Sequence, residues 1–140
     1  GFEVATCSDR AGLISGTYGA RVESTCSYGD ARPGEYAAVV FIGGDGATAM
    51  ADDSSARHLA VDAAAAGCVL GAICAAPLVP ARAGILEMRR ATCHASVRDE
   101  LVSRGAVIVD QPVVVSEWIV TAAGPSAARD FARAIVKLIH

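Results

Sequence analysis

Two apolar runs that end in turns of small residues constrain the fold more than any other feature. The first, YAAVVFIGGDG at residues 36–46, is continuous and ends in glycines. The second, CVLGAI at residues 68–73, leads directly into the small residues of CAAP. A short continuous apolar run bounded by turn residues is typical of a strand that is buried on both faces of a sheet. We therefore expect two interior strands that each feed a loop.

Helix-like segments alternate with these and other strand-like segments. Residues 52–67 offer Asp and Ser as N-terminal caps and Gly67 as a C-terminal stop, which predicts a helix. Pro80 lies inside another helix-like stretch, so that helix should bend or begin late. The remaining pattern predicts strands at 2–8, 19–24, 89–93 and 107–110, a hairpin at 112–124 that turns at Ser116-Glu117, and helices at 75–84, 96–106 and 125–140.

This alternation predicts an α/β sandwich with a largely parallel sheet. We find no repeat and no Pro- or Ser-rich linker, so residues 1–140 are expected to form a single domain. In sheets of this kind the ligand site lies at the carboxyl ends of the strands. Both IGGDG and AICAAP fall at such ends.

Composition excludes several classes of protein. A hydrophobic content of 53% is incompatible with intrinsic disorder. The net charge of −3 and the scattered basic residues argue against nucleic acid as the main partner. No apolar stretch reaches the length of a membrane span, and GFEVATCSDR lacks the pattern of a signal peptide. We expect a cytoplasmic protein that does not bind membranes.

The five cysteines predict reduced thiols and not a disulfide framework. Their odd number and the lack of paired short spacings favour a cytoplasmic protein, and the widely spaced histidines argue against a zinc site. Cys26 lies in a loop-like stretch where it is expected to be exposed and oxidisable. The cysteines expected to pack in or beside strands are Cys7, Cys68 and Cys93.

Cys74 is the candidate nucleophile. It stands between an apolar run and a helix-like stretch with small neighbours on both sides, as a nucleophile elbow requires. A thiol before a helix N-terminus is favoured as the thiolate. The amide of Ala75 would point toward a developing oxyanion, and Gly44 would supply a second donor. The alternative is that Cys74 is a small buried packing residue, as most free cysteines are.

Four blocks of the sequence resemble the DJ-1/PfpI family: VVFIGGDG, GAICAAP, RATCHASVRDELVSRGA and VVVSEWIVTAAGPSAARDFARAIVKLI. The resemblance implies a flavodoxin-like sandwich of the class I glutamine amidotransferase superfamily, usually as a homodimer. It implies that Cys74 is the reactive residue. It also implies that the oxyanion site is formed by backbone amides of Ala75 and the glycine loop, Gly43 and Gly44.

His94 matches the position of the active-site histidine in DJ-1-like members of that family. PfpI-like members place a histidine directly after the nucleophile, where this sequence has Ala75. An imidazole near the thiol would shuttle protons. The alternative is a loop histidine that only hydrogen-bonds to backbone.

The resemblance also predicts a missing part. Family members begin with a strand and a helix before the segment that matches GFEVATC, and the turn between them carries a glutamate that hydrogen-bonds to the cysteine. Neither Glu3, Glu23 nor Glu35 occupies an equivalent place. We expect a separate N-terminal polypeptide, or residues outside this sequence, to supply the strand and its carboxylate.

Two classes of function remain open from the sequence. The first is a cofactor-free, metal-free enzyme in which the Cys74 thiolate attacks a small carbonyl or acyl compound, with a glyoxalase-like, deglycase-like, hydrolase-like or hydratase-like outcome. The second is a redox sensor of oxidative stress, or a chaperone-like protein, in which Cys74 oxidises to sulfinate. A third possibility is a binding protein that has lost catalysis.

Overall fold

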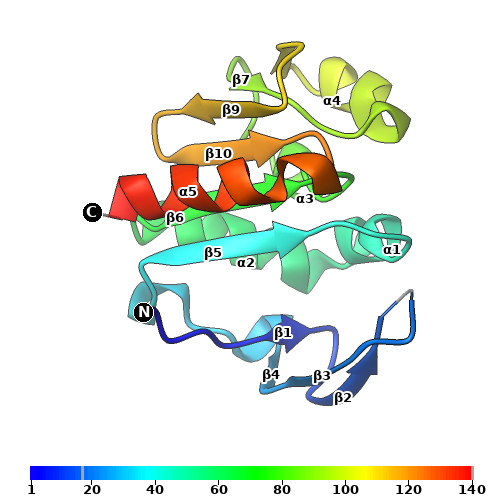
Figure 1. The fold of residues 1–140 in the computed structure, drawn as a ribbon, viewed down its shortest axis with the longest axis vertical. Helices are drawn as coiled ribbons and strands as arrows, with labels where there is room; N and C mark the ends of the chain where they lie inside the picture. Colours follow the sequence, from blue (N-terminus) through cyan, green and yellow to red (C-terminus); the bar gives the residue numbers. More distant parts are fainter. Residues whose placement is uncertain (17, 140) are drawn as a thin grey trace.

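A four-stranded sheet forms the centre of the structure, a computed structural model that describes residues 1–16 and 18–139 (Figure 1). The strand order is β5 (Ala38–Ile42), β6 (Val69–Ile73), β10 (Ile119–Ala122) and β9 (Val113–Ser116). The first three strands are parallel, and β9 is antiparallel to β10. The largely parallel sheet expected from the sequence is confirmed, and β5 and β6 are the two apolar runs.

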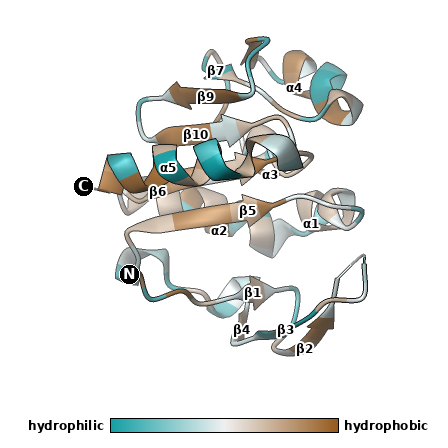
Figure 2. Cartoon of the chain, viewed as in Figure 1, coloured by the Kyte–Doolittle hydropathy of each residue, from teal (hydrophilic) through white to brown (hydrophobic). Residues whose placement is uncertain are grey.

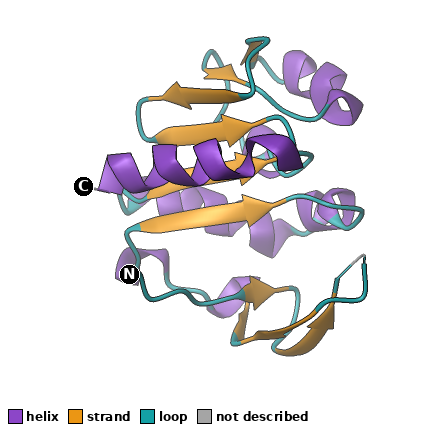
Figure 3. Cartoon of the chain, in the orientation of Figure 1, coloured by secondary structure: helices purple, strands orange, loops and turns teal. Residues whose placement is uncertain are grey.

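Helices cover both faces of this sheet (Figure 3). One face carries α5 (Ala128–Ile139), which packs on β6 and β10. Four helices contribute to the hydrophobic cluster of the other face: α1 (Ala47–Asp52), α2 (Ser54–Ala65), α3 (Leu78–Arg82) and α4 (Arg98–Ser103). No helix of the described residues is long and apolar enough to cross a membrane.

Strand β6 is buried along its whole length because both of its faces are covered. Val69 and Ile73 contribute to the cluster beneath α5, whereas Leu70 and Ala72 contribute to the larger cluster on the opposite face. A Cβ at Gly71 would lie 2.7 Å from Ile135 Cδ1, so the missing side chain lets α5 approach the sheet closely. The sheet strands are correspondingly apolar, whereas α5 alternates between apolar and polar faces (Figure 2).

Several local predictions are confirmed. The side chain of Asp53 accepts a hydrogen bond from Ser55 N at 2.8 Å and caps α2, and Gly67 follows this helix with φ +77°. The hairpin β9–β10 turns at Glu117, which has φ +55°. Helix α3 begins only at Leu78, consistent with a late start near Pro80.

The region before β5 departs from the prediction. The expected strand at residues 2–8 is reduced to β1 (Cys7–Ser8), which pairs in parallel with β4 (Cys26–Ser27). Cys26 is therefore half-buried in a strand and does not lie in an exposed loop. β2 (Gly12–Ser15) and β3 (Arg21–Ser24) form a hairpin. The sequence predicted a strand at the position of β3 but none at the position of β2.

The remaining elements are β7 (Arg90–Ala91), β8 (Val107–Ile108) and the short 3-10 helices η1 (Tyr28–Asp30), η2 (Pro33–Glu35), η3 (Ala95–Val97) and η4 (Pro125–Ala127).

A charged network ties α3 to its neighbours. The Arg82 guanidinium donates to both carboxylate oxygens of Glu100 on α4, at 2.7 and 3.0 Å, and also pairs with Asp52 at the end of α1. Arg104 donates to the same carboxylate at 3.0 Å. These hydrogen bonds, that from Arg82 above all, hold the pKa of Glu100 down at about 2. The network therefore fixes the helix that follows Cys74.

We expect the protein to lose stability as the pH falls from about 5 to 2. Glu100 is ionised in the folded protein at pH values where it is protonated in the unfolded chain, so its contribution disappears as pH falls through this window. Solvent screening reduces the contribution of this partly exposed pair to about 1–2 kcal/mol. Urea unfolding at a series of pH values should show a weaker acid dependence in Glu100→Gln than in the parent. The same dependence in both proteins would contradict the assignment, and Asp99→Asn on the same helix is the control.

Candidate active site

Cys74 lies in a strained turn at the carboxyl end of β6. Its φ of +64° is in the left-handed region, which non-glycine residues rarely adopt. The chain leaves β6 at Ile73, turns through residues 74–77, and enters α3 at Leu78. Cys74 N donates to Ala122 O at 2.9 Å, which anchors the turn to β10. The half-exposed side chain therefore has the placement expected of a nucleophile elbow.

The thiol is further from a helix than the sequence indicated. Helix α3 has five residues and begins four positions after Cys74. The dipole of so short a helix is small and acts only over its first turn. The local amides of the turn are therefore the groups available to stabilise negative charge at this point.

Gly43 and Gly44 bring the end of β5 against the elbow. A Cβ at Gly43 would lie 2.7 Å from Ile73 O, 2.8 Å from Ala75 N and 2.9 Å from Cys74 Cβ, so only glycine fits without displacing backbone. Gly44 has φ +138°, which also requires glycine. Among the described residues, no hydrogen-bond acceptor is found for the amides of Gly44 and Ala75.

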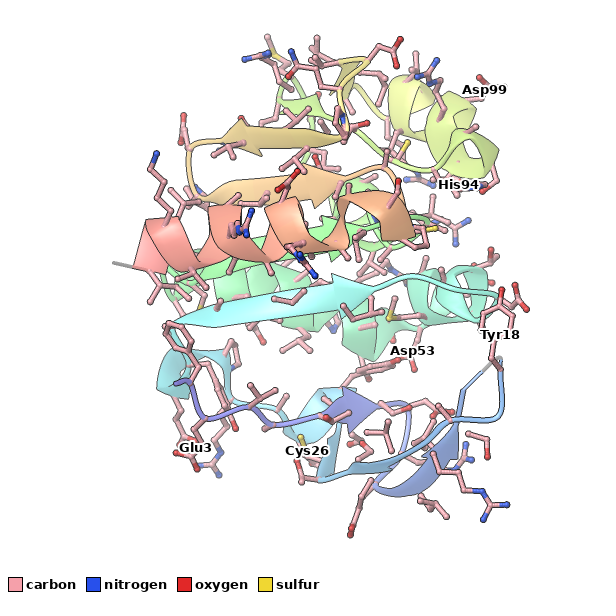
Figure 4. All side chains as sticks on the ribbon, in the orientation of Figure 1. Glu3, Tyr18, Cys26, Asp53, His94 and Asp99 are labelled. Atoms are coloured by element: carbon pink, nitrogen blue, oxygen red, sulfur yellow. The ribbon has the colours of Figure 1, made fainter. Side chains whose placement is uncertain are left out.

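His94 is held next to Cys74 through the backbone. His94 N donates to Cys74 O at 2.7 Å, which joins the segment after β7 to the elbow. Its Nδ1 accepts a hydrogen bond from Ser96 N at 3.1 Å and also lies 2.8 Å from Ser96 Oγ. Because Nδ1 is an acceptor, the neutral ring carries its proton on Nε2. The imidazole is exposed near the start of α4 (Figure 4).

A cavity of about 340 Å³ lies beside His94. Its charged lining is Arg98 and Asp110, whose side chains form an ion pair at 4.0 Å. Cys93 also lines this cavity; burial raises the pKa of its thiol to about 11, which keeps it protonated. Buried Cys68 donates to Pro33 O at 3.0 Å. Both cysteines are buried, as expected for packing residues.

A larger cavity, of about 840 Å³, lies elsewhere in the structure and is not lined by Cys74. It is a groove between residues 2–7 and the free edge of β5, residues 37–42. β5 pairs only with β6, and no other strand of the described residues lies along its opposite edge. The groove lies between the segments FEVATC and VVFIGG, where the family resemblance predicts the missing strand. That a strand fills it stays a prediction.

The carboxylate that the family resemblance predicts beside Cys74 is not found among the described residues. Within that part of the chain, no hydrogen bond joins a carboxylate to the sulfur of Cys74. Asp45 in the glycine loop is exposed. Over the same residues, no group of three or more His, Cys, Asp or Glu side chains is placed to hold a metal ion.

Comparison with known proteins decides the family. The DJ-1/PfpI family matches residues 1–138. This chain belongs to the DJ-1/PfpI family. Its fold is also that of solved members: a ThiJ/PfpI domain protein from Brachyspira murdochii superposes with a TM-score of 0.96 at 30% identity, covering 99% of this chain and 80% of that one.

Relatives in the DJ-1/PfpI family carry enzyme names. The glutathione-independent glyoxalase DJR-1.2 of Caenorhabditis elegans is 31% identical over 87% of this chain, which spans 65% of the length of that protein. Deglycase PfpI of Pyrococcus furiosus is 28% identical to this chain. The match covers 99% of this chain and 84% of the length of that deglycase. The family thus includes glyoxalases and deglycases.

Proposed function

We propose that this chain forms the catalytic part of a cysteine-dependent enzyme that acts on small reactive carbonyl compounds such as methylglyoxal. The observation that carries the proposal is the conformation of Cys74, which has positive φ at the end of a buried strand and keeps its side chain half-exposed. Strained backbone of this kind clusters at functional sites. The names of the glyoxalase and deglycase relatives support the substrate class.

In the proposed reaction the Cys74 thiolate attacks the aldehyde carbon of the substrate. A C–S bond forms, and the carbonyl electron pair moves onto oxygen. The amides of Gly44 and Ala75 would donate hydrogen bonds to that oxyanion. His94 would donate its Nε2 proton to the oxygen and later take a proton back, because Nδ1 is occupied by Ser96. In the glyoxalase outcome the hydrogen on the attacked carbon would move as a proton to the neighbouring carbonyl carbon, which leaves a thioester. Water would then hydrolyse the thioester, the C–S bond would break with the electron pair returning to sulfur, and a 2-oxoaldehyde and water would become a 2-hydroxy acid.

A panel of 2-oxoaldehydes and glycated amines tests this function. Without glutathione, we expect loss of methylglyoxal and an equal amount of lactate. The redox-sensing alternative gives no steady turnover, but peroxide converts Cys74 selectively to sulfinate. Mass spectrometry of the cysteine peptides after peroxide treatment separates the two outcomes.

We further propose that an extended polypeptide segment from outside residues 1–140 fills the groove beside β5 and carries the catalytic carboxylate. Val69 N donates to Ala37 O, so odd-numbered residues of this stretch face β6. By alternation, the amides and carbonyls of Val40 and Ile42 face the groove. Both side chains are exposed although they are apolar, at 39% and 65%. The groove ends next to Gly43, so a residue that follows the inserted strand would reach the elbow.

Hydrogen exchange on protein from its native source tests the inserted segment. We expect the amides of Val40 and Ile42 to be as protected as those of β6, because a parallel strand would bond to them. Native mass spectrometry should give a mass above the 14.2 kDa of residues 1–140. Denaturing conditions then show whether the segment is covalently joined. Rapid exchange at both amides, with a mass of 14.2 kDa, would contradict the proposal.

A further inference from the structure

The Cys7 and Cys26 side chains are paired across two short strands. β1 and β4 are parallel, and their register places Cys7 directly opposite Cys26. Neighbouring strands lie about 4.8 Å apart, within the range of about 4.4–6.8 Å between Cα atoms that a disulfide bridges. Side chains at directly paired positions project from the same face of the strands. The backbone therefore presents the two sulfur atoms to each other.

Contacts that do not involve sulfur hold this pairing in place. Thr25 N donates to Thr6 O at 2.9 Å, and the Thr25 hydroxyl donates to the same oxygen at 3.1 Å. The Ser24 hydroxyl donates to Cys26 O at 2.9 Å. The two strands are thus fixed immediately beside the cysteines, so bridging needs little backbone movement.

Both thiols are accessible in residues 1–140 and interact with each other. Cys7 and Cys26 are half-buried and line the groove beside β5, so a small oxidant can reach them while the groove holds no inserted segment. Burial raises the pKa of the Cys7 thiol to about 12, and a side-chain hydrogen bond with Cys26 adds to this effect. Cys7 is therefore protonated near neutral pH, which leaves Cys26 as the sulfur that reacts first. Figure 4 shows Cys26 in the region below β1, separate from His94.

We propose that Cys7 and Cys26 form a reversible disulfide when the protein meets hydrogen peroxide. The Cys26 thiolate attacks one peroxide oxygen, the O–O bond breaks, and a sulfenic acid and hydroxide form. The Cys7 sulfur then attacks the Cys26 sulfur, the S–O bond breaks, and the departing hydroxide leaves as water with the Cys7 proton. Two thiols are oxidised and one peroxide is reduced to two waters. The proposal does not depend on the activity of Cys74.

The bond would close a loop around the β2–β3 hairpin and fix one wall of the groove. Cross-linking across a loop of this size restricts the unfolded chain, so the oxidised protein should melt at a temperature higher by roughly 5 °C or more. A thiol reductant should reverse the shift.

Peptide mapping after peroxide treatment tests the disulfide. Trypsin separates the two cysteines, since Cys7 falls in residues 1–10 and Cys26 in residues 22–57, because trypsin does not cleave the Arg32-Pro33 bond. After one equivalent of peroxide and alkylation of remaining thiols, we expect a cross-linked pair of these peptides that reduction releases. Intact mass should show the loss of two hydrogen atoms.

Matched variants separate this bond from chemistry at Cys74. Cys7→Ser and Cys26→Ser should each abolish the cross-link and the rise in melting temperature, whereas Cys68→Ser and Cys74→Ser should retain both. Full recovery of alkylated Cys7 and Cys26 peptides from the folded parent protein, while other cysteines are oxidised, would overturn the proposal. That result would leave the turnover assay unaffected, so the two proposals fail independently.

Discussion

Replacing Cys74 by serine should lower kcat/KM for methylglyoxal by roughly 10³-fold or more. A serine hydroxyl is far less nucleophilic than a thiolate at neutral pH, and no base is hydrogen-bonded to this position among the described residues. The substitution removes one sulfur from a half-exposed side chain, so the free energy of unfolding should change by less than about 1 kcal/mol. Initial rates with purified protein measure the first effect, and urea unfolding measures the second.

Cys68→Ser is the matched control for this prediction. Cys68 is buried away from the elbow and donates to Pro33 O, a hydrogen bond that a hydroxyl can replace. This variant should keep the parent turnover. Parent-like rates in Cys74→Ser, or equal losses in both variants, would contradict the role of Cys74.

Gly43→Ala should disrupt both the fold and the site. The new Cβ would lie within 2.9 Å of Cys74 Cβ and nearer still to two backbone atoms, Ile73 O and Ala75 N. Backbone must move to relieve such contacts, at a cost of about 3 kcal/mol in the free energy of unfolding. Because the displaced atoms form the elbow, turnover should fall by roughly 10²-fold or more in the protein that remains folded.

Gly46→Ala, three residues further on, provides the comparison. A Cβ at Gly46 has open space, and its φ of −83° suits alanine. We expect unchanged turnover. We also expect the free energy of unfolding to rise by up to about 1 kcal/mol, because alanine lowers the conformational entropy of the unfolded chain. Equal behaviour of the two variants in urea unfolding and in initial rates would show that Gly43 is not packed against the nucleophile.

The elements predicted well from the sequence are those with strong local signals. β5 and β6 are continuous apolar runs, and the cap at Asp53 and the stop at Gly67 mark α2. The elbow was also predictable, because small residues around Cys74 leave room for a tight turn. The late start of α3 follows from Pro80 and the turn before it.

The elements missed from the sequence depend on weak or long-range signals. Helix α1 begins at Ala47 after Gly46, an N-cap residue that has no side chain to cap the helix, and it contains mostly small residues. Strand β2 begins with Gly12 at φ +113° and is largely exposed, so its apolar pattern is short. The pairing of Cys7 with Cys26 joins positions nineteen residues apart and has no local signature.

The position of His94 was predictable, but its orientation was not. The orientation of the imidazole is set by Ser96, two residues later in the sequence, whose backbone N–H donates a hydrogen bond to Nδ1. The hydrogen bond from His94 N to Cys74 O depends on how the segment after β7 meets the elbow, which only the tertiary fold determines.

Alkylation of Cys74, followed together with activity, shows whether this thiol is the nucleophile. Protein treated with limiting iodoacetamide is digested at intervals, the fraction of each alkylated cysteine is measured by mass spectrometry, and turnover of methylglyoxal is assayed on the same samples. We expect the fraction of activity lost to equal the fraction of Cys74 that is alkylated, and methylglyoxal to slow both processes equally. Activity that persists after Cys74 is fully alkylated would show that Cys74 is not the nucleophile.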